Sequence, residues 1–250
     1  MKIIGVIPAR FASTRFPGKP LALIAGRPLI QHVVEQCQKA GSLQEVVVAT
    51  DDERIRETAQ RFCRVEMTPP DCPSGTDRIA AVVQRCDCEA AVNIQGDEPL
   101  IDPAVIDALA QSLLSNPDWS MATVACPITN ARDLEARSVV KVVVDRDGGA
   151  LYFSRLPIPC TRDGSPDLTS GLYLRHIGIY AYRGAFLKRL VQEPPCKLEQ
   201  TEKLEQLRAM YVGGRIAVIV ATDTGVGVDT PEDVGYVEAA LRKNSEFRIQ

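Results

Sequence analysis

Short apolar runs alternate with amphipathic segments over the first half of the chain, and this alternation constrains the fold more than any other feature. The apolar runs, which we expect to be strands, are residues 3–7, 46–49, 64–67 and 90–94. We expect helices from Pro28 to Gly41, from the cap Asp51 to Ala59, after the cap Ser74, and from Pro103 to Leu114. Strands that are apolar on both faces are typical of parallel sheets covered by helices. The pattern predicts an α/β fold with a doubly wound, mostly parallel sheet.

The alternation ends near residue 120. Further strands are expected at 121–125, 139–145, 151–154, 177–182 and 215–221, with a helix at 201–210. Residues 157–170 predict an exposed loop, residues 147–149 a hairpin turn, and Asp229 with Pro231 the start of a last helix. We therefore expect a nucleotide-binding core of residues 1–120 and 211–250, split by a smaller β-rich region of residues 121–210.

Charge, apolar runs and cysteine spacing exclude several classes of protein. The formal net charge of −3 provides no overall attraction for nucleic acid or anionic membrane. The longest apolar runs, such as 217–221, are far too short to span a bilayer, and the N-terminal stretch is too short for a signal peptide. The eight cysteines contain no CxxC pair, so we expect free thiols and no zinc site. A cytoplasmic protein is predicted.

The loop after the first expected strand carries three cations and no acid. Arg10, Arg15 and Lys19 lie within the stretch IPARFASTRFPGKPL, together with Ser13 and Thr14. Cations without acidic partners favour an anion between them, and hydroxyl and backbone N–H groups add hydrogen bonds to phosphate. The alternative is a solvated loop whose cations pair with acids elsewhere. The loop lacks the Walker and GxGxxG patterns, which argues against a Rossmann dehydrogenase.

Two other expected strand ends carry carboxylates. Asp97 and Glu98 follow the strand at 90–94, and Asp229 follows the strand at 215–221. Carboxylate oxygens suit Mg²⁺, which binds through one or two carboxylates plus substrate phosphates. Taken singly, each could instead cap the helix that follows it. Combined with the cationic loop, they favour in-line substitution at a phosphorus atom.

Successive stretches of the chain resemble, in order, the signatures of one family. The stretches are IPARFASTRFPGKPL, NIQGDEPLI, KVVVD followed by ALYFSR, RHIGIYAYR, LEQTEKLEQLR and GVDTPEDV. The family is 3-deoxy-D-manno-octulosonate (Kdo) cytidylyltransferase, also called CMP-Kdo synthetase. The resemblance implies a nucleotide-diphospho-sugar transferase-like fold and the reaction of CTP with Kdo to CMP-Kdo and pyrophosphate, with Mg²⁺, for lipopolysaccharide biosynthesis. It also implies a homodimer, with the inserted region binding the sugar acid and forming the dimer.

The resemblance assigns roles to individual residues. The residues implied in CTP binding are Ala9, Arg10, Ser13, Arg15, Lys19, Ser74, Arg78 and Gln95. Asp97 and Asp229 would bind Mg²⁺, and with Arg10 and Lys19 they form the implied catalytic set. The residues implied in binding the sugar acid are Arg155, His176, Tyr180, Glu205 and Gln206. Pro73 stands where the family pattern leads us to expect Gln, which puts one nucleotide contact in doubt.

The residue patterns alone leave alternatives open for the sugar-acid residues. His176 lies in an apolar strand, where a histidine is more often a satisfied core residue, but His176 and Tyr180 are expected on the same side of that strand. Glu202, Glu205 and Arg208 lie at helical spacing, which alone indicates a solvated helix face, and only the resemblance assigns Glu205 and Gln206 to a site. The alternative functions are a cytidylyltransferase for another acidic sugar, such as an N-acylneuraminate or 8-amino-Kdo, and a non-catalytic nucleotide sensor.

Overall fold

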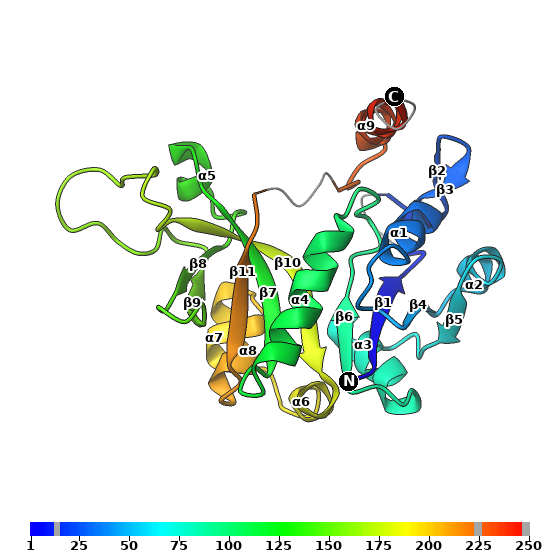
Figure 1. Ribbon diagram of the computed structural model, residues 1–250, viewed down its shortest axis with the longest axis horizontal. Helices are drawn as coiled ribbons and strands as arrows, with labels where there is room; N and C mark the ends of the chain where they lie inside the picture. Colours follow the sequence, from blue (N-terminus) through cyan, green and yellow to red (C-terminus); the bar gives the residue numbers. More distant parts are fainter. Residues whose placement is uncertain (13–15, 223–226, 247–250) are drawn as a thin grey trace. The chain divides into compact units, whose positions relative to one another are not determined.

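The computed structural model describes residues 1–12, 16–222 and 227–246 (Figure 1). The chain divides into two compact units: unit 1 is Met1–Asp107 with Thr224–Gln250, and unit 2 is Ala108–Asp223. These bounds differ from the expected 120 and 211, partly because the strand at Ile216–Val220 pairs with the strand at Met121–Pro127 in unit 2. Among the described residues, no helix combines the length and apolar character needed to cross a membrane.

Unit 1 contains four parallel strands in the order β6-β1-β4-β5. The strands are β1 Ile3–Ala9, β4 Glu45–Thr50, β5 Arg64–Met67 and β6 Ala90–Asn93. The connecting helices are α1 Leu29–Cys37, α2 Glu53–Ala59 and α3 Gly75–Arg85, and α4 Pro103–Ser115 follows β6. This arrangement confirms the predicted mostly parallel α/β sheet. The chain passes outward from β1 to β5 and then returns to the other side of β1, so the strand order reverses between β1 and β6. In open α/β sheets, ligands bind beside the carboxyl ends of strands at such a reversal.

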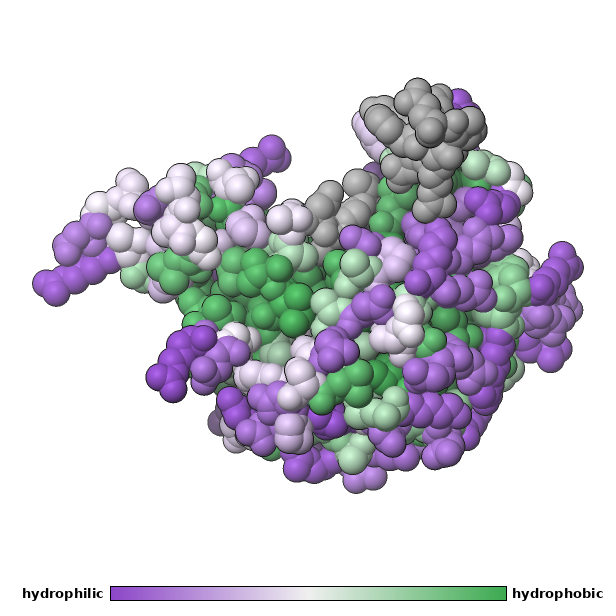
Figure 2. Space-filling view, in the orientation of Figure 1, coloured by the Kyte–Doolittle hydropathy of each residue, from purple (hydrophilic) through white to green (hydrophobic). Residues whose placement is uncertain are grey.

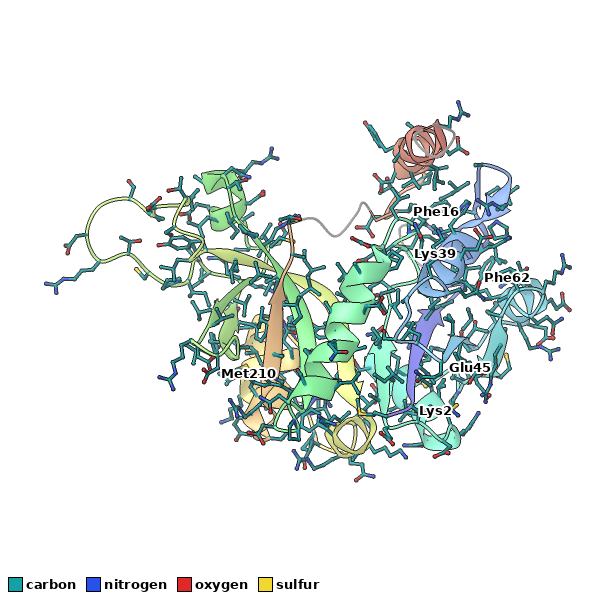
Figure 3. The ribbon with its side chains drawn as sticks, viewed as in Figure 1. Lys2, Phe16, Lys39, Glu45, Phe62 and Met210 are labelled. Carbon is teal, nitrogen blue, oxygen red and sulfur yellow. The ribbon has the colours of Figure 1, made fainter. Side chains whose placement is uncertain are left out.

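A small apolar cluster fixes the C-terminal part of unit 1. After the short helix η1 (Lys19–Leu21), strands β2 (Leu23–Ile24) and β3 (Arg27–Pro28) form a hairpin, and helix α9 spans Asp233–Glu246. Ile24 and Leu29 pack with Val228 and Val237, and Phe16 lies against this cluster (Figure 3). The segment before α9, which contains Asp229, is thus held against the loop that follows β1.

Unit 2 contains a mixed sheet with five strands in its described residues. Strand β7 (Met121–Pro127) pairs antiparallel with β10 (Leu174–Arg183) and parallel with β11 (Ile216–Val220). Strand β8 (Lys141–Val144) pairs antiparallel with β10 and with β9 (Ala150–Ser154). The β8–β9 turn confirms the predicted hairpin, with Gly148 at a φ of 81°. Figure 2 shows apolar side chains on the viewed face over β7 and β11.

Helix boundaries account for most differences from the sequence predictions. The expected helix at 201–210 is two helices, α7 Lys197–Glu202 and α8 Gln206–Tyr211, because Lys203 adopts a left-handed conformation with a φ of 54°. Helices α5 Ala131–Glu135 and α6 Gly184–Leu190 were not expected. Asp52, and not Asp51, caps α2 through a hydrogen bond from Arg54 N.

Candidate active site

Lys19 lies at the end of the cationic loop that follows β1. Gly18 has a φ of 71°, and its N–H donates to the Phe11 carbonyl at 2.9 Å. A side chain at Gly18 would be strained in this left-handed conformation, so glycine is required where the loop turns into η1. Ser13 and Arg15, which were expected to bind phosphate, lie outside the described residues.

The Lys19 ammonium is surrounded by acceptors from the other two predicted strand ends. Its Nζ lies 2.6 Å from Asp97 Oδ2, 3.7 Å from Asp229 Oδ1 and 2.9 Å from the Val228 carbonyl. The side chain of Lys19 is 15% exposed and that of Asp97 is 30% exposed. Lys19 therefore pairs with acids elsewhere, as the alternative interpretation of the loop allows. Those acids are the two expected metal ligands, so three distant parts of the sequence form one charged group.

A pocket of about 310 Å³ lies beside this group, at the carboxyl ends of β1 and β6. Its lining residues are Pro8, Ala9, Arg10, Ala12, Lys19, Pro20, Gly75, Gln95, Gly96 and Asp97. The volume is at the lower end of the range for small-molecule sites. A Cβ at Gly96 would lie 3.0 Å from the Pro8 carbonyl oxygen, so glycine lets the segment after β6 pass close to the end of β1. The pocket contains five of the residues that the sequence assigned to nucleotide or metal.

The N-terminus of α3 adds a favourable site for an anion at this pocket. Gly75 is the first residue of α3 and lines the pocket. Ser74 caps the helix: its Oγ accepts from Asp77 N at 3.2 Å and donates to Asp77 Oδ2 at 2.7 Å. Arg10, also in the lining, donates from Nη2 to the Cys72 carbonyl. Because backbone N–H groups and the helix dipole favour negative charge, this edge of the pocket suits phosphate.

Arg78, expected at the nucleotide, is buried away from the pocket lining. Its side chain is 0% exposed; Nη2 lies 3.0 Å from Asp51 Oδ2, and Nη1 donates to Thr68 Oγ1. The guanidinium ties α3 to the ends of β4 and β5. The contacts of Arg78 therefore indicate a structural role. The sequence did not predict this role, because Asp51 and Thr68 lie in other loops of the chain.

We expect the Arg78→Met variant to lose about 3 kcal/mol of unfolding free energy, because removing one partner leaves the other carboxylate without its buried counter-charge. Urea denaturation followed by circular dichroism measures this quantity. Arg85→Met, on the exposed part of the same helix, is the matched control and should change it by about 0.5 kcal/mol or less. Equal stability of the two variants would contradict a structural role for Arg78.

Glu98, beside Asp97, is a feature that the sequence did not distinguish. Its Oε2 is buried and has no hydrogen-bond partner among the described residues. Burial, with a smaller contribution from the Asp97 charge, raises the pKa of Glu98 to about 7. Neighbouring carboxyl groups thus differ: Asp97 contacts the Lys19 ammonium, whereas Glu98 is held largely protonated below neutral pH.

Asp233 fixes the backbone of the segment that carries Asp229. Its Oδ2 accepts from the N–H groups of Asp229 and Thr230, each at 2.8 Å. The hydrogen bonds from the Thr230 and Asp229 N–H groups lower the pKa of Asp233, and the positive charge of Lys19 lowers it slightly further. Helix α9 begins at Asp233, so the expectation that Asp229 opens this helix is wrong. The acid four residues later satisfies the N–H groups of this turn and leaves the Asp229 carboxylate beside Lys19.

The donor atoms around Lys19 fit a hard divalent cation bound together with phosphate. Asp97 and Asp229 both present carboxylate oxygens to one position, and oxygen ligands are those that Mg²⁺ prefers. No group of three or more His, Cys, Asp or Glu side chains suited to a metal ion occurs in the described part of the chain. The donor set therefore suits a metal shared with a substrate and does not suit a metal held by protein ligands alone.

In unit 2, His176 is oriented by an irregularity in β10. The register of β10 against β7 shifts between Ile177 and Tyr180. Thr123 Oγ1 lies 2.8 Å from the Ile179 carbonyl and 2.9 Å from His176 Nε2. Because the hydroxyl proton goes to a carbonyl, His176 Nε2 must donate, which leaves Nδ1 as an acceptor. Burial lowers the pKa of His176 to about 3, so the ring is neutral at physiological pH.

Tyr180 lies on the same side of β10 as His176, as predicted. The ring centroids of the two side chains are 5.5 Å apart, and those of Tyr180 and Tyr182 are 5.9 Å apart. Burial raises the pKa of the Tyr180 phenol well above its usual value, so it remains an O–H donor. The face thus combines a neutral acceptor with a neutral donor, a pair suited to sugar hydroxyl groups.

Arg155 and Glu202 join the end of β9 to helix α7. Arg155 Nε donates to the Glu202 carbonyl at 2.6 Å, and its Nη1 donates to the Arg137 carbonyl at 3.0 Å. Glu202 in return accepts from Ser154 Oγ at 2.8 Å and from Arg155 N at 2.9 Å. Lys141, fully buried, also contacts this region, with Nζ 2.7 Å from the Arg155 carbonyl. Sequence reasoning missed Glu202 and Lys141, since helical spacing makes Glu202 look like a solvated residue.

Glu205 and Gln206 lie at the start of α8, where Glu205 occupies the N-cap position. Gln206 is 5% exposed, and its Nε2 has no hydrogen-bond partner within the described residues. This burial excludes a solvated face for Gln206. An amide without a partner costs free energy, which a ligand that accepts a hydrogen bond would recover.

Histidine burial predicts a pH dependence of stability. The pKa of His176 is near 3 in the folded chain and about 6.5 when unfolded, so the unfolded chain binds more protons between these values. Stability should therefore fall as pH decreases below about 6.5, by about 2 kcal/mol between pH 7 and pH 5 from this residue. Urea denaturation of the unmodified chain and of His176→Gln measures this difference. An equal pH dependence in both chains would contradict it.

Comparison with known proteins shows the family to which the chain belongs. A family model described as cytidylyltransferase matches residues 4–216. Relatives named 3-deoxy-manno-octulosonate cytidylyltransferase occur in Bdellovibrio bacteriovorus, with 50% identity over 96% of this chain and 98% of the relative, and in Geobacter sulfurreducens, with 50% identity over 97% and 100%. The chain belongs to the 3-deoxy-manno-octulosonate cytidylyltransferase family. The resemblance stated from the sequence motifs is thereby confirmed.

Solved structures agree with membership of this cytidylyltransferase family. A CMP:2-keto-3-deoxy-manno-octonic acid synthetase complexed with CTP is similar with a TM-score of 0.91 and 42% identity, covering 98% of this chain and 100% of that one. A 4-diphosphocytidyl-2C-methyl-D-erythritol synthase from Anaerococcus prevotii has a TM-score of 0.63 at 12% identity, over 96% of each chain. The second likeness concerns the fold alone and is consistent with the nucleotidyltransferase architecture.

Proposed function

We propose that the chain transfers the cytidylyl group of CTP to Kdo, giving CMP-Kdo and pyrophosphate. The observation that carries the proposal is the convergence of Lys19, Asp97 and Asp229 beside the pocket at the ends of β1 and β6. An ammonium, two carboxylates and a helix N-terminus are the groups that bind a triphosphate and its metal ion. In this proposal Ala9, Arg10 and Gln95 line the nucleotide pocket.

We assign the sugar acid to the unit 2 residues. His176 Nδ1 is an acceptor, the Tyr180 phenol is a donor, and the Gln206 amide is a buried donor without a partner. Neutral groups of this kind recognise hydroxyl groups without attracting unrelated ions. The Arg155 guanidinium donates to the backbone carbonyls of residues 137, 202 and 203. Its remaining N–H groups would bind the substrate carboxylate.

We propose Mg²⁺ as the cofactor, held by Asp97 and Asp229. When bound, it would neutralise charge on the triphosphate and lower the pKa of the attacking sugar hydroxyl. The residues of this chain do the remaining work: Lys19 and Arg10 would hold phosphate oxygens, and Gly75 N–H would face them. Activity should need a divalent ion and should prefer Mg²⁺ or Mn²⁺ to softer ions, because the ligands are oxygens.

The reaction is proposed as direct attack by the anomeric hydroxyl of Kdo on the α-phosphorus. The new P–O bond forms as the bond between the α-phosphorus and pyrophosphate breaks, and the hydroxyl proton passes to solvent. Neither histidine forms a dyad with a cysteine or serine in the described contacts, so nothing there supports a covalent enzyme intermediate. Inversion at a chiral α-thiophosphate of CTP is expected, and retention would require two displacements.

Pyrophosphate release with CTP and a panel of sugar acids tests the proposed function. Kdo should be turned over with a higher kcat/KM than 8-amino-Kdo or N-acetylneuraminate, with CMP-Kdo identified by mass spectrometry. Preference for another acid would move the assignment to a different sugar within the same reaction. CTP binding without turnover of any acid would favour the nucleotide sensor and overturn the proposal.

We also propose a cytoplasmic homodimer that supplies CMP-Kdo to lipopolysaccharide biosynthesis. The eight cysteines are free thiols, as is usual in a reducing compartment. Unit 2 exposes Leu151, Leu156 and Leu172 at 59%, 55% and 53%, and an interface between copies would cover such large apolar side chains. Sedimentation equilibrium should give twice the mass of one chain, and a monomer at micromolar concentration would contradict the dimer.

A further inference from the structure

The Lys19 ammonium lies where the two proposed metal ligands converge. It contacts Asp97 Oδ2 at 2.6 Å and lies 3.7 Å from Asp229 Oδ1. A backbone carbonyl, that of Val228, accepts a third contact at 2.9 Å. Two carboxylate oxygens and a carbonyl oxygen around one position form the kind of environment that a hard cation takes. In this structure the Lys19 ammonium occupies that position.

The environment of Lys19 is rigidly built. Val228 is fully buried in the apolar cluster with Ile24 and Leu29, and its N–H donates to the Asp97 carbonyl at 2.8 Å. Asp233 fixes the backbone N–H groups of Asp229 and Thr230. The acceptors around the ammonium are therefore held by the fold, and Lys19, with its long side chain, is the member of the group that can move most easily.

We propose that Lys19 holds the metal position in the absence of substrate, and that the metal ion displaces the ammonium from Asp97 and Asp229. A divalent cation and an ammonium cannot share these oxygens, because like charges a few ångströms apart repel strongly. The released ammonium can then bind the triphosphate, whose negative charge replaces that of the two carboxylates. Metal and nucleotide would thus favour each other's binding through one side chain. The inference rests on the proposed function only in naming Asp97 and Asp229 as metal ligands.

Mn²⁺ binding to the full chain without nucleotide tests this exchange directly. Electron paramagnetic resonance of free Mn²⁺ gives the dissociation constant for the unmodified chain and for Lys19→Met, which keeps the length of the side chain and removes its charge. We expect the variant to bind Mn²⁺ at least about tenfold more tightly. Lys188→Met, an exposed lysine of α6, removes the same charge and should leave the constant unchanged.

Adding Asp97→Asn to Lys19→Met should abolish the gain in Mn²⁺ affinity, because the carboxylate that binds both the ammonium and the metal ion is then lost. Equal or weaker Mn²⁺ binding by Lys19→Met would overturn the proposal, as would a gain that survives Asp97→Asn. These outcomes do not depend on turnover, so failure of the exchange is distinct from failure of the proposed reaction, which the pyrophosphate assay tests separately.

A second measurement uses the unmodified chain and does not depend on the folding of a variant. Brief acetylation followed by peptide mass spectrometry reports how available the Lys19 amine is. Mg²⁺ should raise acetylation of Lys19 several-fold as the ammonium leaves its acceptors, while acetylation of Lys188 stays constant. No change at Lys19 at saturating Mg²⁺ would also overturn the proposal.

Discussion

Replacing Asp97 with Asn should lower kcat for CMP-Kdo formation by about 10³-fold while retaining measurable affinity for CTP. The side chain keeps its size and one oxygen, but it loses the charge that would hold the metal ion against the triphosphate. Removing one electrostatic contact to a developing charge typically costs about 10² to 10³ in kcat, and a metal ligand carries more than one such contact. Steady-state pyrophosphate release and calorimetric titration with CTP measure the two quantities.

Asp229→Asn should behave in the same way, because its carboxylate faces the same ammonium at 3.7 Å. The matched control is Asp87→Asn, which changes the same charge at an exposed position. Stability should change by about 1 kcal/mol or less in each variant, since the pair with Lys19 is partly exposed. Full activity of Asp97→Asn, or of the unmodified chain in excess chelator, would remove both carboxylates from the proposed metal site.

Replacing Lys19 with Ala should lower kcat/KM for CTP by about 10- to 100-fold. Losing a hydrogen bond between an ammonium and a phosphate oxygen costs about 1.5–3 kcal/mol, and no apolar packing in the loop requires this side chain. Initial rates over a range of CTP concentrations at saturating Kdo and Mg²⁺ measure the effect. The same change is predicted for Arg15→Ala from the sequence alone.

Lys39→Ala is the control for Lys19→Ala. Lys39 is exposed and contacts Gln36 Oε1 at 2.6 Å within unit 1 (Figure 3). Its substitution removes the same charge without touching the pocket and should leave kcat/KM unchanged. Wild-type kinetics in Lys19→Ala would show that the cationic loop does not bind the triphosphate.

Much of unit 1 could be predicted because its signals are local. The apolar period and the turn residues lie within each segment, so strand β5 was placed at its observed bounds, and Ser74 was recognised as the cap of α3. Helix ends were less predictable. Lys203 breaks the expected helix by adopting a left-handed conformation, which a lysine side chain does not predict.

The approach of the loops after β1 and β6 was also predictable, because parallel strands present their carboxyl ends at one edge of a sheet. The sequence could therefore name Lys19 and Asp97 as members of one site. It could not show that they pair with each other: the two are 78 residues apart, and the Val228 carbonyl that shares the ammonium is 209 residues from it.

The sequence by itself determined the family, the parallel sheet and the chemical types of the site residues. Short motifs indicate the family and the site residues, and the spacing of apolar residues indicates the sheet. Only the tertiary structure decided which partner each charged group takes. It buried Arg78 against Asp51, fixed the tautomer of His176 through Thr123, and placed the Lys19 ammonium between two carboxylates. Hydrogen bonds and ion pairs are set by distances of a few ångströms, which only packing of the whole chain determines.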